Sequence, residues 1–146
     1  MNAYEVTSDT RRMDPVAIHA FLTQSYWSPG VPLDVVRRAM KGSLCFGVLL
    51  DGAQVAFARV ITDRATFAYL ADVYVLEQHR GKGLSRALLD AVFAHPELQG
   101  LRRFMLATRD AHGLYAKYGF GPLQDHGRIM MRGNGHTDAA KGQSGT

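Results

Sequence analysis

Apolar and polar residues alternate, or apolar residues run together, in several short stretches of the chain, and both patterns are typical of β-strands. These stretches predict strands over residues 2–7, 44–50, 54–62, 66–76, 101–108 and 128–132. Asp51-Gly52 lies between the second and third of them, and this dipeptide favours a two-residue hairpin turn. The strands on either side of Asp51-Gly52 are therefore expected to pair antiparallel.

Apolar residues at helical spacing predict helices between these strands. Asp14 followed by Pro15 predicts the N-cap and first turn of a helix that reaches about Gln24. Pro32 opens a second short helix, and Gly119 ends the last one. The remaining helices are predicted over residues 83–94 and 110–118. Strands and helices in this order predict a fold of the α/β (α+β) class with a mixed sheet.

The length of 146 residues suits one domain, and its composition changes only near the C-terminus. From Gly133 the chain is rich in Gly, Asn, Thr, Gln and Ser, so residues 133–146 are expected to be a disordered tail after a domain over residues 1–132. No signal peptide or membrane span is predicted. The single cysteine, Cys45, fits a reducing compartment, and a cytoplasmic location is expected.

The formal net charge of +4 favours an anionic partner. Lys and Arg are scattered and form no basic face, which argues against nucleic acid as partner. No membrane partner is expected, because no apolar run is long enough for a span. The 6 histidines lack the spacing of metal ligands, and no cysteine pair accompanies them, so no metal site is predicted. A phosphate-bearing small molecule remains the best explanation of the charge.

One basic turn, Arg80-Gly81-Lys82-Gly83, joins the strand that ends near Leu76 to the helix that begins near residue 83. Glycines let a ligand approach the backbone, and free N–H groups at a helix start bind anions. The spacing excludes a P-loop, and Arg86 stands where a dinucleotide fingerprint needs a third glycine or alanine. A third phosphate-binding pattern, Gln/Arg-x-x-Gly-x-Gly/Ala, is met by residues 78–83; a turn without any ligand remains the alternative.

The hexapeptide at 78–83 resembles the pyrophosphate loop of the GCN5-related N-acetyltransferase (GNAT) family. A second segment, residues 108–120, is similar to the family pattern Asn-x-x-Ala-x-x-Leu-Tyr-x-x-x-Gly-Phe. The resemblance spans roughly residues 2–132 and implies a single GNAT-like domain, with a mixed, mostly antiparallel sheet flanked by helices on both faces. The positions that match the second pattern are Ala111, Leu114, Tyr115, Gly119 and Phe120.

The resemblance implies that acetyl-CoA is the co-substrate and a primary amine, expected to be that of a small molecule, the acceptor. By position, Val73-Tyr74-Val75 would pair with the pantetheine arm, and the Val73 N–H would bind the thioester carbonyl oxygen. Thr108 stands where the family usually has Asn. Tyr115 matches the tyrosine that protonates the departing thiolate, and packing of the last helix is its alternative role. The N–H groups implied in pyrophosphate binding are those of Arg80, Gly81, Lys82, Gly83, Leu84 and Ser85.

A general base and an acceptor site are also needed. Asp72 interrupts an apolar strand, where an unpaired carboxylate is costly, and it is the best candidate for the base. Its alternative, weighed equally, is a structural acceptor to Arg59 or to backbone. Further base candidates are Asp110 and His112, and expected acceptor-binding residues are Tyr26 and Trp27 as an aromatic wall, Asp72, and Arg59 and Arg64 for a substrate carboxylate.

Three rival functions stay open at this point. The first is a non-catalytic sensor that binds acetyl-CoA on the same fold, and the second is an N-acetyltransferase of proteins or peptides. The third, a small basic nucleic-acid binder, lacks the contiguous basic face that it needs. Homodimers are frequent in the family, so the resemblance makes a homodimer an expected state.

Overall fold

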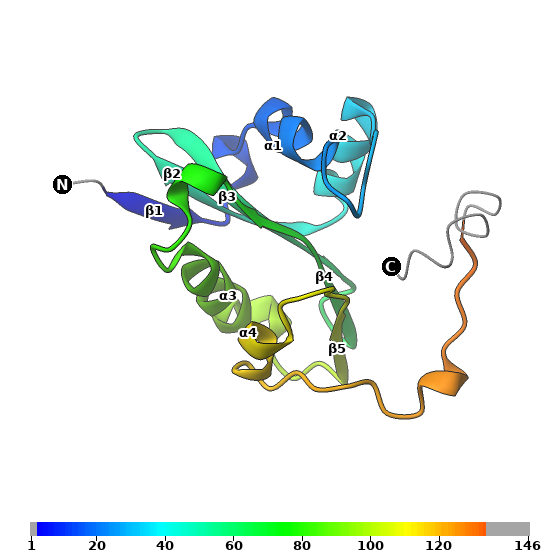
Figure 1. Cartoon of the computed structure of the whole chain (residues 1–146). Helices are drawn as coiled ribbons and strands as arrows, with labels where there is room; N and C mark the ends of the chain where they lie inside the picture. The colour runs from blue at the N-terminus through cyan, green and yellow to red at the C-terminus, as the bar shows by residue number, and fades with distance from the viewer. Residues whose placement is uncertain (1–2, 134–146) are drawn as a thin grey trace. The chain divides into compact units, whose positions relative to one another are not determined.

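The computed structural model describes residues 3–133, and its sheet has five strands in the order β1-β2-β3-β4-β5 (Figure 1). The first three pairs of neighbours are antiparallel, and β4 and β5 are parallel. This confirms the predicted mixed, mostly antiparallel sheet. The strands are β1 (Tyr4–Thr7), β2 (Leu44–Leu50), β3 (Ala53–Thr62), β4 (Phe67–Val75) and β5 (Arg103–Leu106).

Helices cover both faces of this sheet (Figure 1). On one face, α1 (Pro15–Leu22) packs against β3 and α2 (Leu33–Lys41) against β2; on the other, α3 (Leu84–Ala94) packs against β1 to β4. The α1 and α2 side holds a core of buried residues, and α3 contributes an apolar stripe to the opposite face. Buried on the first side are Ile18, Leu22, Val36, Met40, Phe57 and Tyr74, and on α3 Leu84, Leu88, Leu89 and Val92.

Two local sequence signals produce the structure that they predicted. The side chain of Asp14 accepts hydrogen bonds from the N–H groups of Val16 and Ala17, so it caps α1. Asp51 and Gly52 both have positive φ, 51° and 83°, which is the backbone of a two-residue hairpin turn between β2 and β3. Both predictions are confirmed.

Contacts divide the chain into two compact units, residues 1–107 and residues 108–146. The sheet and the first three helices all belong to the first unit. The second unit contains α4 (His112–Ala116) and Gly119, whose φ of 93° follows the end of that helix as predicted. The predicted tail over 134–146 lies outside the described residues.

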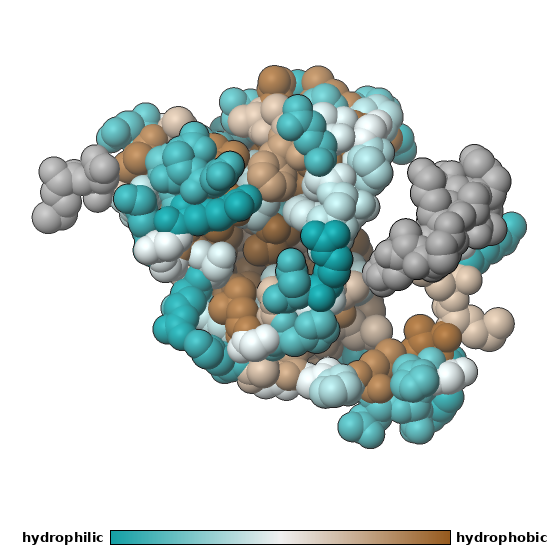
Figure 2. Space-filling model, in the orientation of Figure 1, coloured by the Kyte–Doolittle hydropathy of each residue, from teal (hydrophilic) through white to brown (hydrophobic). Residues whose placement is uncertain are grey.

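The strand predicted at 128–132 is wrong. A short 3-10 helix, η4 (His126–Arg128), occupies its start, and no strand follows up to residue 133. Ile129, Met130 and Met131 are three apolar residues in succession, so they lack the alternation that would bury one face. Met130 is 93% exposed, and apolar side chains of the segment after η4 lie at the surface (Figure 2).

Across residues 3–133, no helix combines the length and apolar character needed to cross a bilayer.

Candidate active site

A β-bulge in β4 lies at the centre of the candidate site. Phe57 pairs with Tyr74 and Arg59 with Ala71, so one residue of β3 is opposite two residues of β4, Asp72 and Val73. Asp72 has a φ of 58°, a left-handed backbone that Asp tolerates better than most residues. The bulge bends β4 at this point.

Beyond the bulge, β4 is no longer paired with β5. The parallel ladder runs from Phe67 to Leu70, and β5 ends at Leu106 while β4 continues to Val75. The last five residues of β4, 71–75, therefore leave one edge without a neighbouring strand among the described residues of the first unit. An unpaired strand edge is a row of peptide groups available to a ligand.

The direction of the β4 peptide groups follows from one hydrogen bond. The Leu76 N–H donates to the Val55 carbonyl of β3 at 2.9 Å. Because N–H groups alternate along a regular strand, the Tyr74 N–H also faces β3, and that of Val75 faces the open edge. Val73 lies in the bulge, where this alternation is interrupted. The contacts of Val73 and Val75 with a pantetheine arm stay predictions.

Tyr74 differs from its neighbours and from the predicted role. Its side chain is buried, and its ring stacks on that of Phe21 with centroids 4.0 Å apart. Burial raises the pKa of its phenol, as do the charges of Asp14 and Asp72 to a smaller degree. With its side chain in the core and its N–H toward β3, Tyr74 packs in the core, and the cofactor contacts of residues 73–75 stay predictions.

The glycine turn follows this strand after a short 3-10 helix, η2 (Glu77–His79). Gly81 and Gly83 have φ values of 78° and 79°, and Gly83 is the N-cap of α3. A Cβ at either position would meet no atom within 4 Å, so the left-handed backbone, rather than crowding, favours glycine there. No side chain caps the first N–H groups of α3. The turn thus has open space above its glycines and no side-chain cap on the first N–H groups of α3, two features that favour an anion site; binding of a pyrophosphate there stays a prediction.

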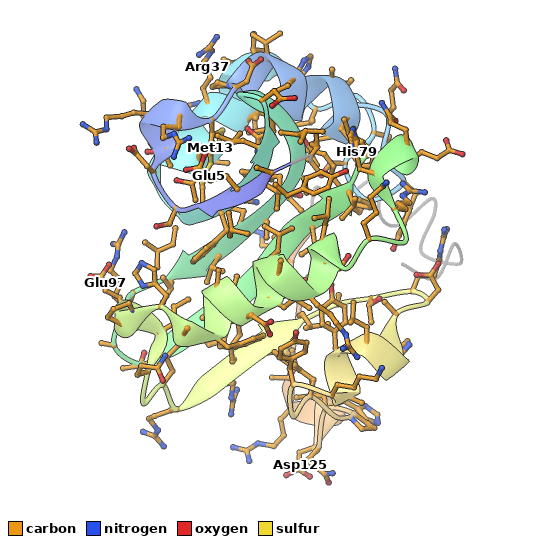
Figure 3. All side chains as sticks on the ribbon, turned by 90° about the vertical axis from the view of Figure 1, so that its left-hand side faces the viewer. Glu5, Met13, Arg37, His79, Glu97 and Asp125 are labelled. Carbon is orange, nitrogen blue, oxygen red and sulfur yellow. The ribbon has the colours of Figure 1, made fainter. Side chains whose placement is uncertain are left out.

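Two side chains fix the turn to the sheet. The Arg80 Nε donates to the Val75 carbonyl at 2.9 Å, which ties the turn to the open edge of β4. His79 shares a hydrogen bond of 2.9 Å between its Nδ1 and the Tyr4 hydroxyl of β1, and it lies on the short helix that precedes the turn (Figure 3). Lys82 and Ser85 lie on the turn and the first turn of α3, Lys82 fully at the surface.

The Asp72 side chain is fully engaged with the protein. Its Oδ2 accepts from Arg59 Nε at 2.8 Å, and its Oδ1 accepts from Trp27 Nε1 at 2.9 Å. Arg59 also donates from Nη1 to the Ser43 hydroxyl at 3.0 Å. Only 16% of the Arg59 side chain and 10% of the Asp72 side chain are exposed. Asp72 thus accepts a hydrogen bond from Arg59, which was one of its two predicted roles. The other role, as general base, stays a prediction.

A small pocket of about 130 Å³ lies beside this ion pair, between the α1–α2 segment and the sheet. Its wall is mostly apolar, and Arg59 and Asp72 are the charged residues in it. Tyr26 and Trp27, predicted as its aromatic wall, do not line it: they contact each other edge to face at 5.0 Å, and Trp27 reaches the site through Asp72. The lining residues are Leu22, Ser28, Val31, Val35, Val36, Ala39, Met40, Phe57, Arg59 and Asp72.

Two features of this region differ from the sequence prediction. Arg64, a predicted carboxylate ligand, lies in the β3–β4 turn with its Nε 3.1 Å from Glu97, and it does not line the pocket. Ser43 was not predicted as a site residue. No local pattern links Ser43 to Asp72, because the link runs through Arg59 on a different strand.

The second unit carries the predicted proton donor. Tyr115, on α4, is buried, and its ring contacts that of Phe120 edge on with centroids 6.1 Å apart. The Thr108 hydroxyl accepts from the Ala111 N–H at 3.0 Å, so it holds the start of α4. Asp110 and His112 are exposed beside it. The catalytic role of Tyr115 and the cofactor role of Thr108 stay predictions.

Within residues 3–133, no group of three or more His, Cys, Asp or Glu side chains is placed to hold a metal ion.

Comparison with known proteins gives one consistent family. Residues 10–120 match the model of the acetyltransferase (GNAT) family. A candidate acetyltransferase of Gibberella zeae is 34% identical over 137 residues, which cover 78% of this chain and 76% of the relative.

Solved structures of acetyltransferases are similar to this chain as well. A candidate GNAT acetyltransferase of Xanthomonas campestris is 57% identical with a TM-score of 0.88, over 91% of this chain and 94% of that chain. An aminoglycoside N-acetyltransferase in complex with CoA has the same fold at 17% identity, with a TM-score of 0.63 over 92% of this chain and 97% of that one. The chain therefore belongs to the GNAT family of acetyltransferases.

Proposed function

We propose that this protein transfers an acetyl group from acetyl-CoA to the primary amine of a small molecule. One observation carries the proposal: the unpaired end of β4, which includes Val73 and Val75, is followed after one short 3-10 helix by the glycine turn and the uncapped N-terminus of α3. An extended amide-containing arm that ends in a pyrophosphate has the chemistry to follow such a path. The fold shared with the CoA-bound aminoglycoside N-acetyltransferase supports the same cofactor.

The turn fits a pyrophosphate on three independent grounds. Its two left-handed glycines leave open space above the backbone, and no side chain caps the first N–H groups of α3. The α3 dipole places partial positive charge at this point. Arg80 and Lys82 add full positive charges, and Arg80 is held in place by the Val75 carbonyl. Together these groups favour a multiply charged anion.

At the open edge, the protein's own task is to stabilise charge on a carbonyl oxygen. Acetyl-CoA supplies an activated thioester, on which an attacking amine builds negative charge at the carbonyl oxygen. The donor that we assign to that oxygen is the Val73 N–H, in the bulge between the paired residues Ala71 and Tyr74. A preorganised donor of this kind contributes about 3 kcal/mol of transition-state stabilisation.

The experiment compares two glycine variants by calorimetric titration with acetyl-CoA. Gly83→Trp fills the open space above the turn and is expected to weaken acetyl-CoA binding by at least about tenfold, a loss of about 1.4 kcal/mol. Gly100→Trp is a matched control, since Gly100 has a φ of 71° and no atom within 4 Å of its Cβ position, and lies outside the turn. Unchanged acetyl-CoA binding by Gly83→Trp would refute the assignment of the turn.

A non-catalytic acetyl-CoA sensor is the second candidate, and one observation favours it. Both oxygens of Asp72, the predicted base, are already hydrogen-bonded to Arg59 and Trp27. Release of free CoA thiol, followed with a panel of amines, separates the two functions. Tight acetyl-CoA binding without amine-dependent thiol release would establish the sensor.

A further inference from the structure

We propose that the acceptor is a monoamine whose compact aliphatic group, of about the size of an isobutyl or isopentyl group, fills the pocket beside Arg59 and Asp72. This inference rests on the proposed function and adds the chemical class of the substrate. It is argued from the pocket's size, its charge and the polar groups that remain available at its end.

Size limits the occupant to a few carbon atoms. The pocket measures about 130 Å³. An apolar cavity of about 150 Å³ holds one benzene molecule, so this pocket holds roughly four or five carbons. Its aliphatic wall comes mainly from α2 and the segment before it, with Val31, Val35, Val36 and Met40. Branched side chains of this kind favour a branched alkyl group through dispersion contacts.

Charge excludes acceptors with a second ionised group. Arg59 and Asp72 neutralise each other at 2.8 Å, and the remaining lining residues are uncharged. A diamine would bring a second ammonium that has no carboxylate of its own in the pocket. An amino acid would bring a carboxylate that competes with Asp72 for Arg59, whose Nε and Nη1 are already used. Either would leave a desolvated charge without a full partner, which is costly.

The polar end of the pocket is suited to an amino group. Ser28 lines the pocket, and its hydroxyl makes no hydrogen bond with any residue that the structure describes. Its backbone is fixed, because its N–H donates to the Ser25 hydroxyl at 3.1 Å and its carbonyl accepts from Val31 at 3.1 Å. Asp72 lines the same pocket and immediately precedes Val73. An amine held near Asp72 therefore lies near the bulge that carries the proposed carbonyl donor.

The first test compares amines that differ in one charged group. Isopentylamine and L-leucine share the same branched chain, and leucine adds only a carboxylate; cadaverine adds a second ammonium to a five-carbon chain. We expect kcat/KM for isopentylamine to exceed that for either of the others by at least about tenfold. A preference for leucine, for cadaverine or for a polyamine such as spermidine would overturn the proposal.

The second test changes the size of the pocket. Ala39→Leu fills it, and kcat/KM for isopentylamine should fall at least about tenfold, since each extra methylene in a filled pocket already costs about 1–3 kcal/mol. Activity with methylamine should persist. Val35→Ala enlarges the pocket and should raise activity with phenethylamine relative to isopentylamine. Arg37→Leu, at the exposed outer surface of α2 (Figure 3), is the control and should change neither.

The outcomes separate this inference from the proposed function. If the wild-type protein binds acetyl-CoA and acetylates amines, but Ala39→Leu and Val35→Ala leave its selectivity unchanged, the pocket is not the acceptor site and only this inference fails. If the wild-type protein binds no acetyl-CoA, the proposed function fails and this inference fails with it. Acetyl-CoA binding measured on each variant confirms that the variant is folded.

Discussion

The ion pair of Arg59 with Asp72 gives a prediction about stability that the structure makes quantitative. Asp72→Asn is the informative change, because Asn tolerates the left-handed backbone at φ 58° as Asp does, and so the bulge is kept. An amide has one acceptor oxygen where the carboxylate has two. One of the two donors, Arg59 Nε or Trp27 Nε1, must therefore lose its acceptor, and Arg59 loses its counter-charge in either case.

The expected magnitude follows from burial. Removing one partner of a buried ion pair lowers the free energy of unfolding by about 3–5 kcal/mol. Both side chains here keep a small exposure, so we expect a loss near the lower end, about 3 kcal/mol. For a chain of this length that corresponds to a fall in Tm of roughly 6–12 °C. Replacing both residues, in Arg59→Met with Asp72→Asn, removes the buried charges together and should lie closer to wild type than the sum of the single changes.

Urea unfolding followed by tryptophan fluorescence is the assay. Trp27 is the only tryptophan of the chain and is hydrogen-bonded to Asp72, so its emission reports on this site as well as on unfolding. The double-mutant cycle should give a coupling free energy of about 2 kcal/mol. A matched control is the Arg64 and Glu97 pair, with a similar distance of 3.1 Å but side chains 46% and 51% exposed. Its cycle should give less than about 1 kcal/mol.

One result would refute this reasoning. The reasoning fails if the coupling free energy of the Arg59 and Asp72 cycle is no larger than that of the Arg64 and Glu97 cycle. Burial would then not strengthen the first ion pair. The pocket would then lack a firmly held charged end, and the argument that it rejects second charges would lose its basis.

Three other outcomes are expected. Gly47→Ala should destabilise the fold by about 1–3 kcal/mol in urea unfolding, because the new Cβ would lie 2.7 Å from Gln54 Nε2, which is held by its bond to the Ala56 carbonyl; adding Gln54→Ala should recover part of the loss. Burial raises the pKa of the Cys45 thiol to about 11 from 9.0, so the native thiol should resist alkylation at pH 8, and stability should fall as pH rises from about 9 to 11, where the unfolded thiol ionises first. Tyr115→Phe should lower kcat by about 10²-fold or more with acetyl-CoA binding retained; an unchanged kcat would leave Tyr115 a packing residue.

The elements that the sequence predicted correctly have their cause within a few neighbouring residues. Asp51-Gly52 alone determines the hairpin turn, and Asp14 with Pro15 alone determines the start of α1. The strand predicted at 128–132 had no such signal. It depended on an apolar run without alternation and on a pairing partner that the described residues do not provide.

The candidate site was less predictable because its contacts join distant segments. The sequence identified Asp72 as a polar residue in an apolar strand. It also gave Arg59 as one possible hydrogen-bond partner of Asp72, as an alternative to the role of general base. The bulge itself depends on the register against β3, which no pattern within β4 reveals. The hydrogen bond from Trp27 to Asp72 spans 45 positions of sequence. Ser43 is connected to the site only by its hydrogen bond with Arg59.

The bulge at Asp72 connects the stability of the fold with the chemistry proposed for the site. It lies just beyond the point where pairing with β5 ends, it contains Val73, and its Asp72 carboxylate is bound by Arg59 and Trp27. An activity loss in Asp72→Asn is therefore not evidence of a base by itself. A base predicts a lower kcat and the loss of the acidic limb of its pH profile. A positioning role predicts a higher KM for the amine, an altered Trp27 emission and an unchanged pH profile, and the observed hydrogen bonds favour this second result.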